Sequence, residues 1–177
     1  MSAFLKKLQN KDSNILIFLN SSMKCGVLDI VMPIITYIGS FSFATAICVV
    51  YFFIPLITFK VIAIKTASSL ILSSLIARLI KITVNRIRPY ILINNLNIKK
   101  IGIDNYSFPS GHTTSAFSIA VMLALFFPHI AVITVGIAFL VGVSRMYLGV
   151  HYPTDVLVGM LLGTFSSFVV YFYAILL

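Results

Sequence analysis

Three short polar clusters stand where long apolar runs begin or end. They are residues 81–89, 109–112 and 144–155. Such groups are costly in an apolar chain, because a charged side chain at the centre of a bilayer costs roughly 2.5–3.5 kcal/mol on insertion scales. The clusters combine cations, imidazoles and a carboxylate, which suit the binding and transfer of a phosphate group. We therefore predict that they meet at one membrane face and form one phosphate-handling site.

A histidine and an aspartate stand four residues apart in the last cluster, with Pro153 between them at an expected helix start. Asp155 can accept a hydrogen bond from one imidazole nitrogen of His151. The other nitrogen then keeps a lone pair for an electrophile, so the pair predicts a nucleophile or a base. Taken alone, such a pair can also be structural. No third carboxylate or cysteine stands at ligand spacing, so we predict no metal ion.

The middle cluster, Pro-Ser-Gly-His, ends in Ser110, Gly111 and His112 and should open a helix. The unpaired N–H groups of a helix start bind anions. Ser110 can cap the helix or donate to an oxyanion, and Gly111 lets the backbone approach a phosphate. His112 can carry a proton near neutral pH. The alternative is a capping serine followed by an interfacial histidine.

Fixed positive charge for phosphate oxygens is available from Lys81, Arg88 and Arg145. Arginine presents planar, forked donors that match phosphate, and lysine presents a mobile point charge. In isolation these side chains could instead lie along the membrane edge with their charges in water. We favour that second interpretation for Arg86, Lys99 and Lys100.

The composition is that of an integral membrane protein. Of 177 residues, 60% are hydrophobic and 10% are charged, whereas soluble domains carry about 25% charged residues. The net charge of +9 suits anionic headgroups or phosphates. A mostly apolar chain has little aqueous surface for nucleic acid, so we predict no nucleic-acid partner. Cys25 and Cys48 form no disulfide or metal pattern, and no signal peptide is evident.

The apolar runs predict an all-α membrane bundle that positions the clusters. We expect one domain over residues 1–177, with interfacial helices in 1–38 and a transmembrane catalytic core in 39–177. Residues 1–23 are amphipathic and should lie on the membrane, although a frayed polar terminus is the alternative. About five spans of sufficient length are expected. They cover approximately residues 41–56, 61–84, 110–127, 130–143 and 153–177.

Counting these crossings puts all three clusters on the same face. Within the second span, Arg78, Lys81 and Asn85 share one helical face at i, i+3 and i+7. Their neighbours are mostly apolar, so this polar stripe should face the protein interior or the interface. The loop 91–106 carries seven apolar residues and is expected to rest on the bilayer surface: Ile91, Leu92, Ile93, Leu96, Ile98, Ile101 and Ile103. Lys99 and Lys100 would add attraction for an anionic lipid.

Together the clusters form a pattern of fixed spacing. Six residues separate Lys81 from Arg88-Pro89, the Pro-Ser-Gly-His cluster follows, and Ser144-Arg145, His151 and Asp155 complete the pattern. This pattern resembles the signature of the type 2 phosphatidic acid phosphatase superfamily, which includes membrane lipid phosphatases, soluble acid phosphatases and haloperoxidases. The resemblance covers roughly residues 78–160 and every signature position, whereas the first 40 residues carry none of it.

The resemblance implies a role for each signature residue. His151 attacks phosphorus and becomes a phosphohistidine, Asp155 orients it, and His112 protonates the leaving oxygen. The group that activates water stays open. The remaining positions bind phosphate oxygens: Lys81, Arg88, Ser110, Gly111 and Arg145. Phosphoryl transfer needs positioning and charge neutralisation, so we predict an enzyme without a metal or other cofactor.

The resemblance further implies a lipid phosphatase of a bacterial cell membrane, and we favour undecaprenyl diphosphate as its substrate. The alternatives are phosphatidylglycerophosphate or phosphatidic acid, a phospholipid-binding protein without activity, and a vanadate-type peroxidase. The paired histidines argue against binding alone, and the spans argue against a peroxidase. The family favours an extracytoplasmic site. The lysines of the N-terminal segment, counted by the positive-inside rule, favour a cytoplasmic one.

Overall fold

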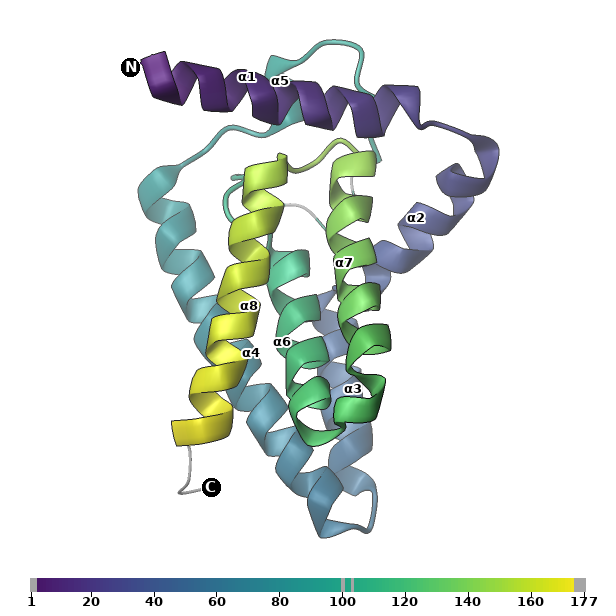
Figure 1. The fold of residues 1–177 in the computed structure, drawn as a ribbon, viewed down its shortest axis with the longest axis vertical. Coiled ribbons are helices and arrows are strands. Elements are labelled where there is room, and N and C mark those ends of the chain that lie inside the picture. The colour runs from purple at the N-terminus through teal and green to yellow at the C-terminus, as the bar shows by residue number, and fades with distance from the viewer. Residues whose placement is uncertain (1–2, 100, 103, 174–177) are drawn as a thin grey trace.

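The computed structural model describes residues 3–99, 101–102 and 104–173 (Figure 1). Lys100, Ile103 and the expected end of the last span at 174–177 lie outside the described residues. Every regular element of the described part is helical, which confirms the predicted all-α fold. In chain order the elements are α1 (Ala3–Ile17), a π-helical turn (Phe18–Ser22), α2 (Gly26–Ile38), α3 (Phe41–Phe53), α4 (Ile57–Val84), α5 (Pro89–Leu92), α6 (Gly111–Phe126), a 3₁₀ turn (Pro128–Ile130), α7 (Ala131–Tyr147) and α8 (Pro153–Tyr173).

The helix ends follow the capping residues of the sequence. The chain breaks between α2 and α3 at Gly39-Ser40 as predicted, and the Ser40 hydroxyl caps α3 by accepting from the Phe43 N–H. Asn85 ends α4 in the left-handed conformation with φ 49°, which asparagine tolerates better than most residues. One boundary differs from expectation, because α7 continues to Tyr147 instead of stopping near 143. Arg145 is therefore a helical residue.

Three segments of the described chain are long and apolar enough to cross a membrane: Ile57–Leu92, Pro128–Tyr147 and Pro153–Tyr173. The pair α2 and α3 passes the same test together but bends by 53°, and α6 is a shorter apolar helix. The five predicted spans correspond to α3, α4, α6, α7 and α8. Five is thus an approximate number of spans. The prediction separated an interfacial helix from the first span, whereas α2 and α3 together form one bent apolar pair.

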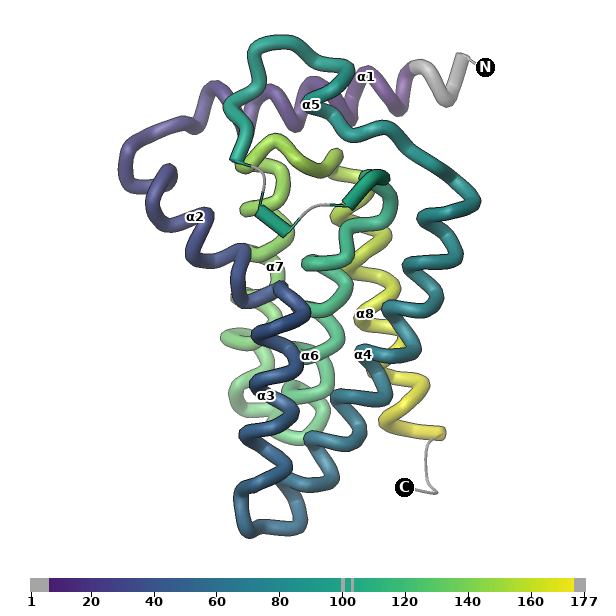
Figure 2. Tube along the Cα trace, turned by 180° about the vertical axis from the view of Figure 1, so that it is seen from behind, coloured from purple at the N-terminus to yellow at the C-terminus, as the bar shows by residue number. Residues whose placement is uncertain are grey.

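Helix α6 lies at the centre of the bundle, packed by α4, α7 and α8 (Figures 1 and 2). All ten residues from Thr113 to Met122 are buried. Two glycines of α8 allow this close approach: a Cβ at Gly163 would stand 2.4 Å from the Thr114 carbonyl oxygen, and one at Gly159 would stand 2.8 Å from that of Ser110. Small residues serve this purpose in membrane bundles. The close packing at these two glycines holds the start of α6 against α8.

The N-terminal helix α1 lies across the end of the bundle where α4 and α7 finish (Figure 1). Asn20, 1% exposed in the π-helical turn, donates to the carbonyls of Tyr147 and Asn97 and accepts from the Asn97 N–H. This segment is ordered by specific buried contacts, so the alternative of a frayed terminus is wrong for the described residues. Through Asn97, the same contacts also fix the loop that precedes α6.

Candidate active site

The three polar clusters converge at the bundle end beneath α1, as the crossing count predicts. His151 lies in the loop between α7 and α8 and is 2% exposed, and Asp155 is fully buried in the first turn of α8. The Ser110 N–H donates to the Asp155 carbonyl oxygen at 3.0 Å. That hydrogen bond joins the middle cluster to the last one.

The histidine ring stands between a carboxylate and a cation. Nδ1 of His151 lies 3.5 Å from Oδ2 of Asp155 and makes no hydrogen bond to the described part of the chain, and Nε2 lies 3.4 Å from Nη1 of Arg88. The Tyr152 N–H donates to Asp155 Oδ2 at 2.8 Å, which fixes the carboxylate. Catalytic hydrogen bonds of this kind commonly shorten when substrate binds. Nε2 is therefore the nitrogen turned toward the phosphate-binding cations.

Burial and nearby charge determine the protonation of this ring. Desolvation, followed by the positive charges of Arg145 and Arg88, holds the pKa of His151 well below its usual range. Both effects disfavour the imidazolium form. The ring thus keeps a free lone pair at neutral and mildly acidic pH, which a nucleophile requires.

A carboxylate from the loop before α6 pairs with Lys81 of α4 and with Arg88, the N-cap of α5. Arg88 is 1% exposed and donates to the Asp104 carbonyl and carboxylate at 2.8 and 2.7 Å. Lys81 donates to both carboxylate oxygens of Asp104 at 3.0 and 2.7 Å. Burial would raise the pKa of Asp104, but the hydrogen bonds and charges of Lys81 and Arg88 outweigh it and lower that pKa. Two of the cations predicted to bind phosphate are thus paired with a carboxylate.

The guanidinium of Arg145 is fully buried and anchors the loop before α6. Nη1 donates to the Thr36 hydroxyl at 2.9 Å and the Ile101 carbonyl at 2.8 Å, and Nη2 donates to the Gly102 carbonyl at 3.3 Å. Arg145 therefore positions the loop, and its buried Nε is left without a partner among the described residues.

Ser110 and His112 flank the start of α6. Ser110 is fully buried and is the N-cap, with Oγ accepting from the Thr113 hydroxyl at 2.9 Å and from its N–H at 3.5 Å. The backbone of Gly102, at φ +53°, packs on the His112 ring, where an added Cβ would stand 2.4 Å from Cε1. Only glycine fits there. Gly111 has open space on its Cβ side.

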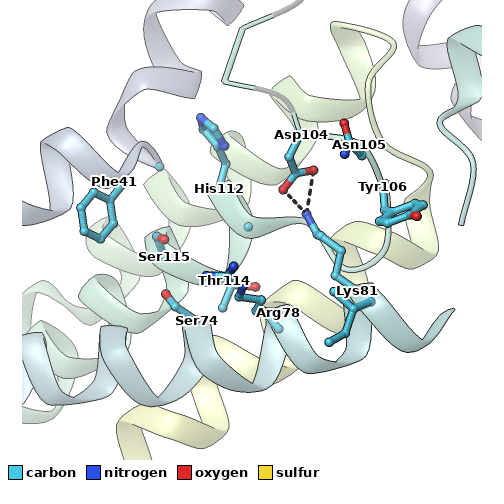
Figure 3. A pocket seen from close by; sticks show the side chains of 14 residues that line it. Phe41, Ser74, Arg78, Lys81, Asp104, Asn105, Tyr106, His112, Thr114 and Ser115 are labelled. Atoms are coloured by element: carbon cyan, nitrogen blue, oxygen red, sulfur yellow. Dashed lines mark hydrogen bonds and ion pairs between the residues drawn. The ribbon is translucent and has the colours of Figure 1, made fainter. Parts of the chain in front are cut away.

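A cavity of about 500 Å³ lies beside these residues, between α3, α4, α6 and the loop before α6 (Figure 3). Lys81, Asp104, Gly111 and His112 all line it. In the described residues no group of three or more histidine, cysteine or acidic side chains is placed to hold a metal ion.

The interpretation of Arg86 as a side chain at the membrane edge is wrong. Its Nη1 donates to Asp155 Oδ1 and to the Thr154 hydroxyl, each at 2.6 Å, and its Nη2 donates to Asp12 Oδ2 at 2.6 Å. The guanidinium also lies 4.0 Å from the Tyr152 ring centroid. The buried carboxylates of Asp12 and Asp155 hold it in place because each would otherwise be an unpaired charge. Lys99, by contrast, is exposed and donates to the Asp29 carbonyl.

We expect Arg86→Gln to lower kcat by about 10- to 100-fold with little change in KM, equivalent to about 1.4–2.8 kcal/mol of barrier. The reason is that Arg86 holds Asp155 in place, and Asp155 is the residue predicted to orient His151. Asp12→Asn should cause a smaller loss in the same direction, and Arg86→Lys should restore part of kcat. Steady-state kinetics together with thermal unfolding in detergent measure this. An unchanged kcat in Arg86→Gln would show that Asp155 needs no such support.

Sequence reasoning missed Arg86, Asp12 and Asp104. One signal was available for Asp104, since it is the sole acidic residue between Arg86 and Ser110. Nothing in the local sequence links Asp12 to Arg86, 74 positions away.

Two curated proteins are similar in sequence to part of this chain. BcrC of Bacillus licheniformis, described as a bacitracin transport permease protein, is 42% identical over 88 residues, or 49% of this chain and 43% of that protein. The undecaprenyl-diphosphatase of Sulfolobus acidocaldarius is 33% identical over 108 residues, or 60% of this chain and 52% of that protein. The chain thus spans about half the length of these curated relatives.

The whole fold has a counterpart among solved structures. The crystal structure of Aquifex aeolicus LpxE superposes with a TM-score of 0.81 at 29% identity, covering 90% of this chain and 94% of that one. The family model of the PAP2 superfamily matches residues 62–175, which include all three polar clusters. With the signature spacing, the site geometry and the fold in agreement, the chain belongs to the PAP2 superfamily.

Proposed function

We propose that this protein is a membrane lipid phosphatase that removes the terminal phosphate of undecaprenyl diphosphate. The observation that carries the proposal is the position of His151, buried between Asp155 and Arg88 at the end of an apolar helix bundle. Binding alone would need only the cations, whereas this ring is held as a nucleophile would be.

In the proposed reaction, Nε2 of His151 forms a bond to the terminal phosphorus as the bond to the leaving oxygen breaks. The electron pair stays on that oxygen, and His112 supplies its proton. Lys81, Arg88 and Arg145, with Ser110 and Gly111 at the start of α6, neutralise the phosphate oxygens. Water then hydrolyses the phosphohistidine, which releases inorganic phosphate and restores the ring. No metal or cofactor takes part in these steps.

Lipid rather than soluble substrate is supported by the surroundings of the site. The cavity beside His112 also has apolar lining residues, among them Phe41 and Ile82. Ile91 and Leu92, at the end of α5, are exposed and suit contact with the bilayer. The undecaprenyl-diphosphatase of Sulfolobus acidocaldarius supports a polyprenyl diphosphate as the substrate.

Phosphate release by the purified protein in detergent tests the proposal. Undecaprenyl diphosphate, phosphatidylglycerophosphate, phosphatidic acid and p-nitrophenyl phosphate are compared, with His151→Ala as the blank. We expect long-chain lipids to be far better substrates than the soluble ester, and activity to survive excess chelator. Activity that needs added Mg²⁺ or Zn²⁺ would contradict the mechanism. Equal efficiency on p-nitrophenyl phosphate would contradict access from the membrane.

We further propose that the site opens outside the cytoplasm, as the family resemblance implies. A single cysteine replaces the exposed Asn94 in a protein lacking Cys25 and Cys48, and intact cells are treated with an impermeant thiol reagent. We expect labelling of intact cells. Labelling only after lysis would place the catalytic end in the cytoplasm, in agreement with the positive-inside count.

A further inference from the structure

Helix α4 carries a second cation beside the site that belongs to no signature position. Arg78 stands three residues before Lys81 and lines the same cavity as Lys81 and His112 (Figure 3). It makes no hydrogen bond or ion pair with the described residues. Three residues along an α-helix correspond to a rise of about 4.5 Å. The backbone of Arg78 thus lies about one turn farther from the catalytic end of α4 than that of Lys81, and its side chain is exposed.

The polar lining continues around Arg78. Ser74 stands one turn before it on α4, and Ser115 faces the cavity from α6. Neither hydroxyl makes a hydrogen bond to the described residues. This part of the cavity therefore offers one guanidinium and two free hydroxyls, which are donors suited to an anion.

The surroundings of Arg78 on α4 show why these groups are unusual. Ile71 and Leu75 lie on the same side of the helix, seven and three residues before Arg78, and Leu79 follows it directly. All three are more than half exposed, as expected of side chains that face lipid. An unpaired arginine on such a helix is costly, and intramembrane charges generally have a partner. Arg78 stands six residues before the end of α4, about 9 Å along the helix axis. An anionic ligand in the cavity would supply the partner that the described residues do not.

We propose that Arg78 binds the second phosphate of a diphosphate lipid, the one that stays on the lipid after the terminal phosphate has moved to His151. This inference rests on the proposed function and narrows its substrate class. The terminal phosphate binds Lys81 and Arg88, and the lipid-linked phosphate binds in the part of the cavity around Arg78. The lipid chain then continues toward the membrane.

The chemistry of the leaving group explains why this cation matters. When His151 attacks a diphosphate, the bridging P–O bond breaks and its electron pair adds one negative charge to the lipid monophosphate. A fixed guanidinium stabilises that charge where it develops. A monoester lipid leaves as an alkoxide, which depends more strongly on the proton from His112. Arg78 should therefore act on diphosphate substrates and hardly on monoesters.

Arg78→Gln and Arg78→Lys test this, with Lys60→Gln as the matched control. Lys60 is exposed on the same helix at its other end, so its replacement removes one charge away from the site. We expect Arg78→Gln to lower kcat/KM for undecaprenyl diphosphate by about 10- to 50-fold and that for phosphatidic acid by less than about threefold. The kcat/KM of Arg78→Lys for undecaprenyl diphosphate should lie between those of Arg78→Gln and wild type, because lysine keeps the charge but loses the forked donors of the guanidinium.

Binding separates this proposal from the proposed function. In the His151→Ala background, Arg78→Gln should weaken binding of undecaprenyl diphosphate by a similar factor and leave binding of phosphatidic acid nearly unchanged, because the single phosphate of that substrate binds Lys81 and Arg88. Equal losses for both lipids, or no loss for either, would overturn the second-phosphate site even if the protein is a phosphatase. A wild type that hydrolyses no lipid would refute the proposed function, while the binding experiment still decides the role of Arg78.

Discussion

Purified His151→Ala protein is expected to release no measurable phosphate from any lipid phosphate, a loss of more than about 1,000-fold. The substitution removes the nitrogen proposed to bond to phosphorus, while Lys81, Arg88 and Arg145 remain to bind substrate. Affinity should therefore change far less than turnover. Wild-type protein quenched during turnover should carry an acid-labile phosphoryl group that the variant lacks.

The burial of His151 calls for a second variant as a control. Because the ring is 2% exposed, alanine also leaves a void that can lower stability. His151→Asn fills most of that volume and should be equally inactive, with thermal unfolding closer to wild type. Hydrolysis by either variant within about tenfold of wild type would exclude a phosphohistidine, since each tenfold corresponds to only about 1.4 kcal/mol of barrier.

Loss of the proposed acid is expected to be nearly as severe. His112→Ala should lower kcat by about 10²- to 10⁴-fold, the usual contribution of a positioned proton donor. KM should stay close to wild type, because the phosphate-binding cations are intact. The loss should be larger for phosphatidic acid than for undecaprenyl diphosphate, since an alkoxide needs a proton more than a leaving phosphate does. Comparing kcat on the two lipids measures this directly.

The third histidine of the chain supplies the control for that experiment. His129 lies in the 3₁₀ turn between α6 and α7, against the ring of Phe127. It therefore stands just before the first residue of α7, whereas Arg145 is near the last. His129→Ala should leave kcat on both lipids unchanged. If His112→Ala instead lost substrate binding with kcat preserved, His112 would be a binding residue and the leaving-group acid would have to be sought elsewhere.

Much of the fold and of the site follows from the sequence because both are encoded locally. Apolar runs long enough to span a bilayer alternate in direction, so counting them places 81–89, 109–112 and 144–155 at one end. The break at Gly39-Ser40 and the cap at Ser110 follow from residue types that end or begin helices. The same spacing that predicts the site also reveals the family, since signature positions are separated by fixed numbers of residues along the chain.

Tertiary structure alone decided which groups surround those residues. Asp12 reaches Arg86 across 74 positions, and no periodicity or spacing connects an amphipathic N-terminal helix to a catalytic carboxylate. The loop before α6 has no regular pattern either, so the pairing of Asp104 with Lys81 and the packing of Gly102 on His112 had to be observed. Arg78 shared a predicted polar stripe with Lys81, but only the packing of α3, α4 and α6 shows that both line one cavity. Sequence periodicity determines which face of a helix a side chain occupies, whereas its partner depends on how separate elements pack.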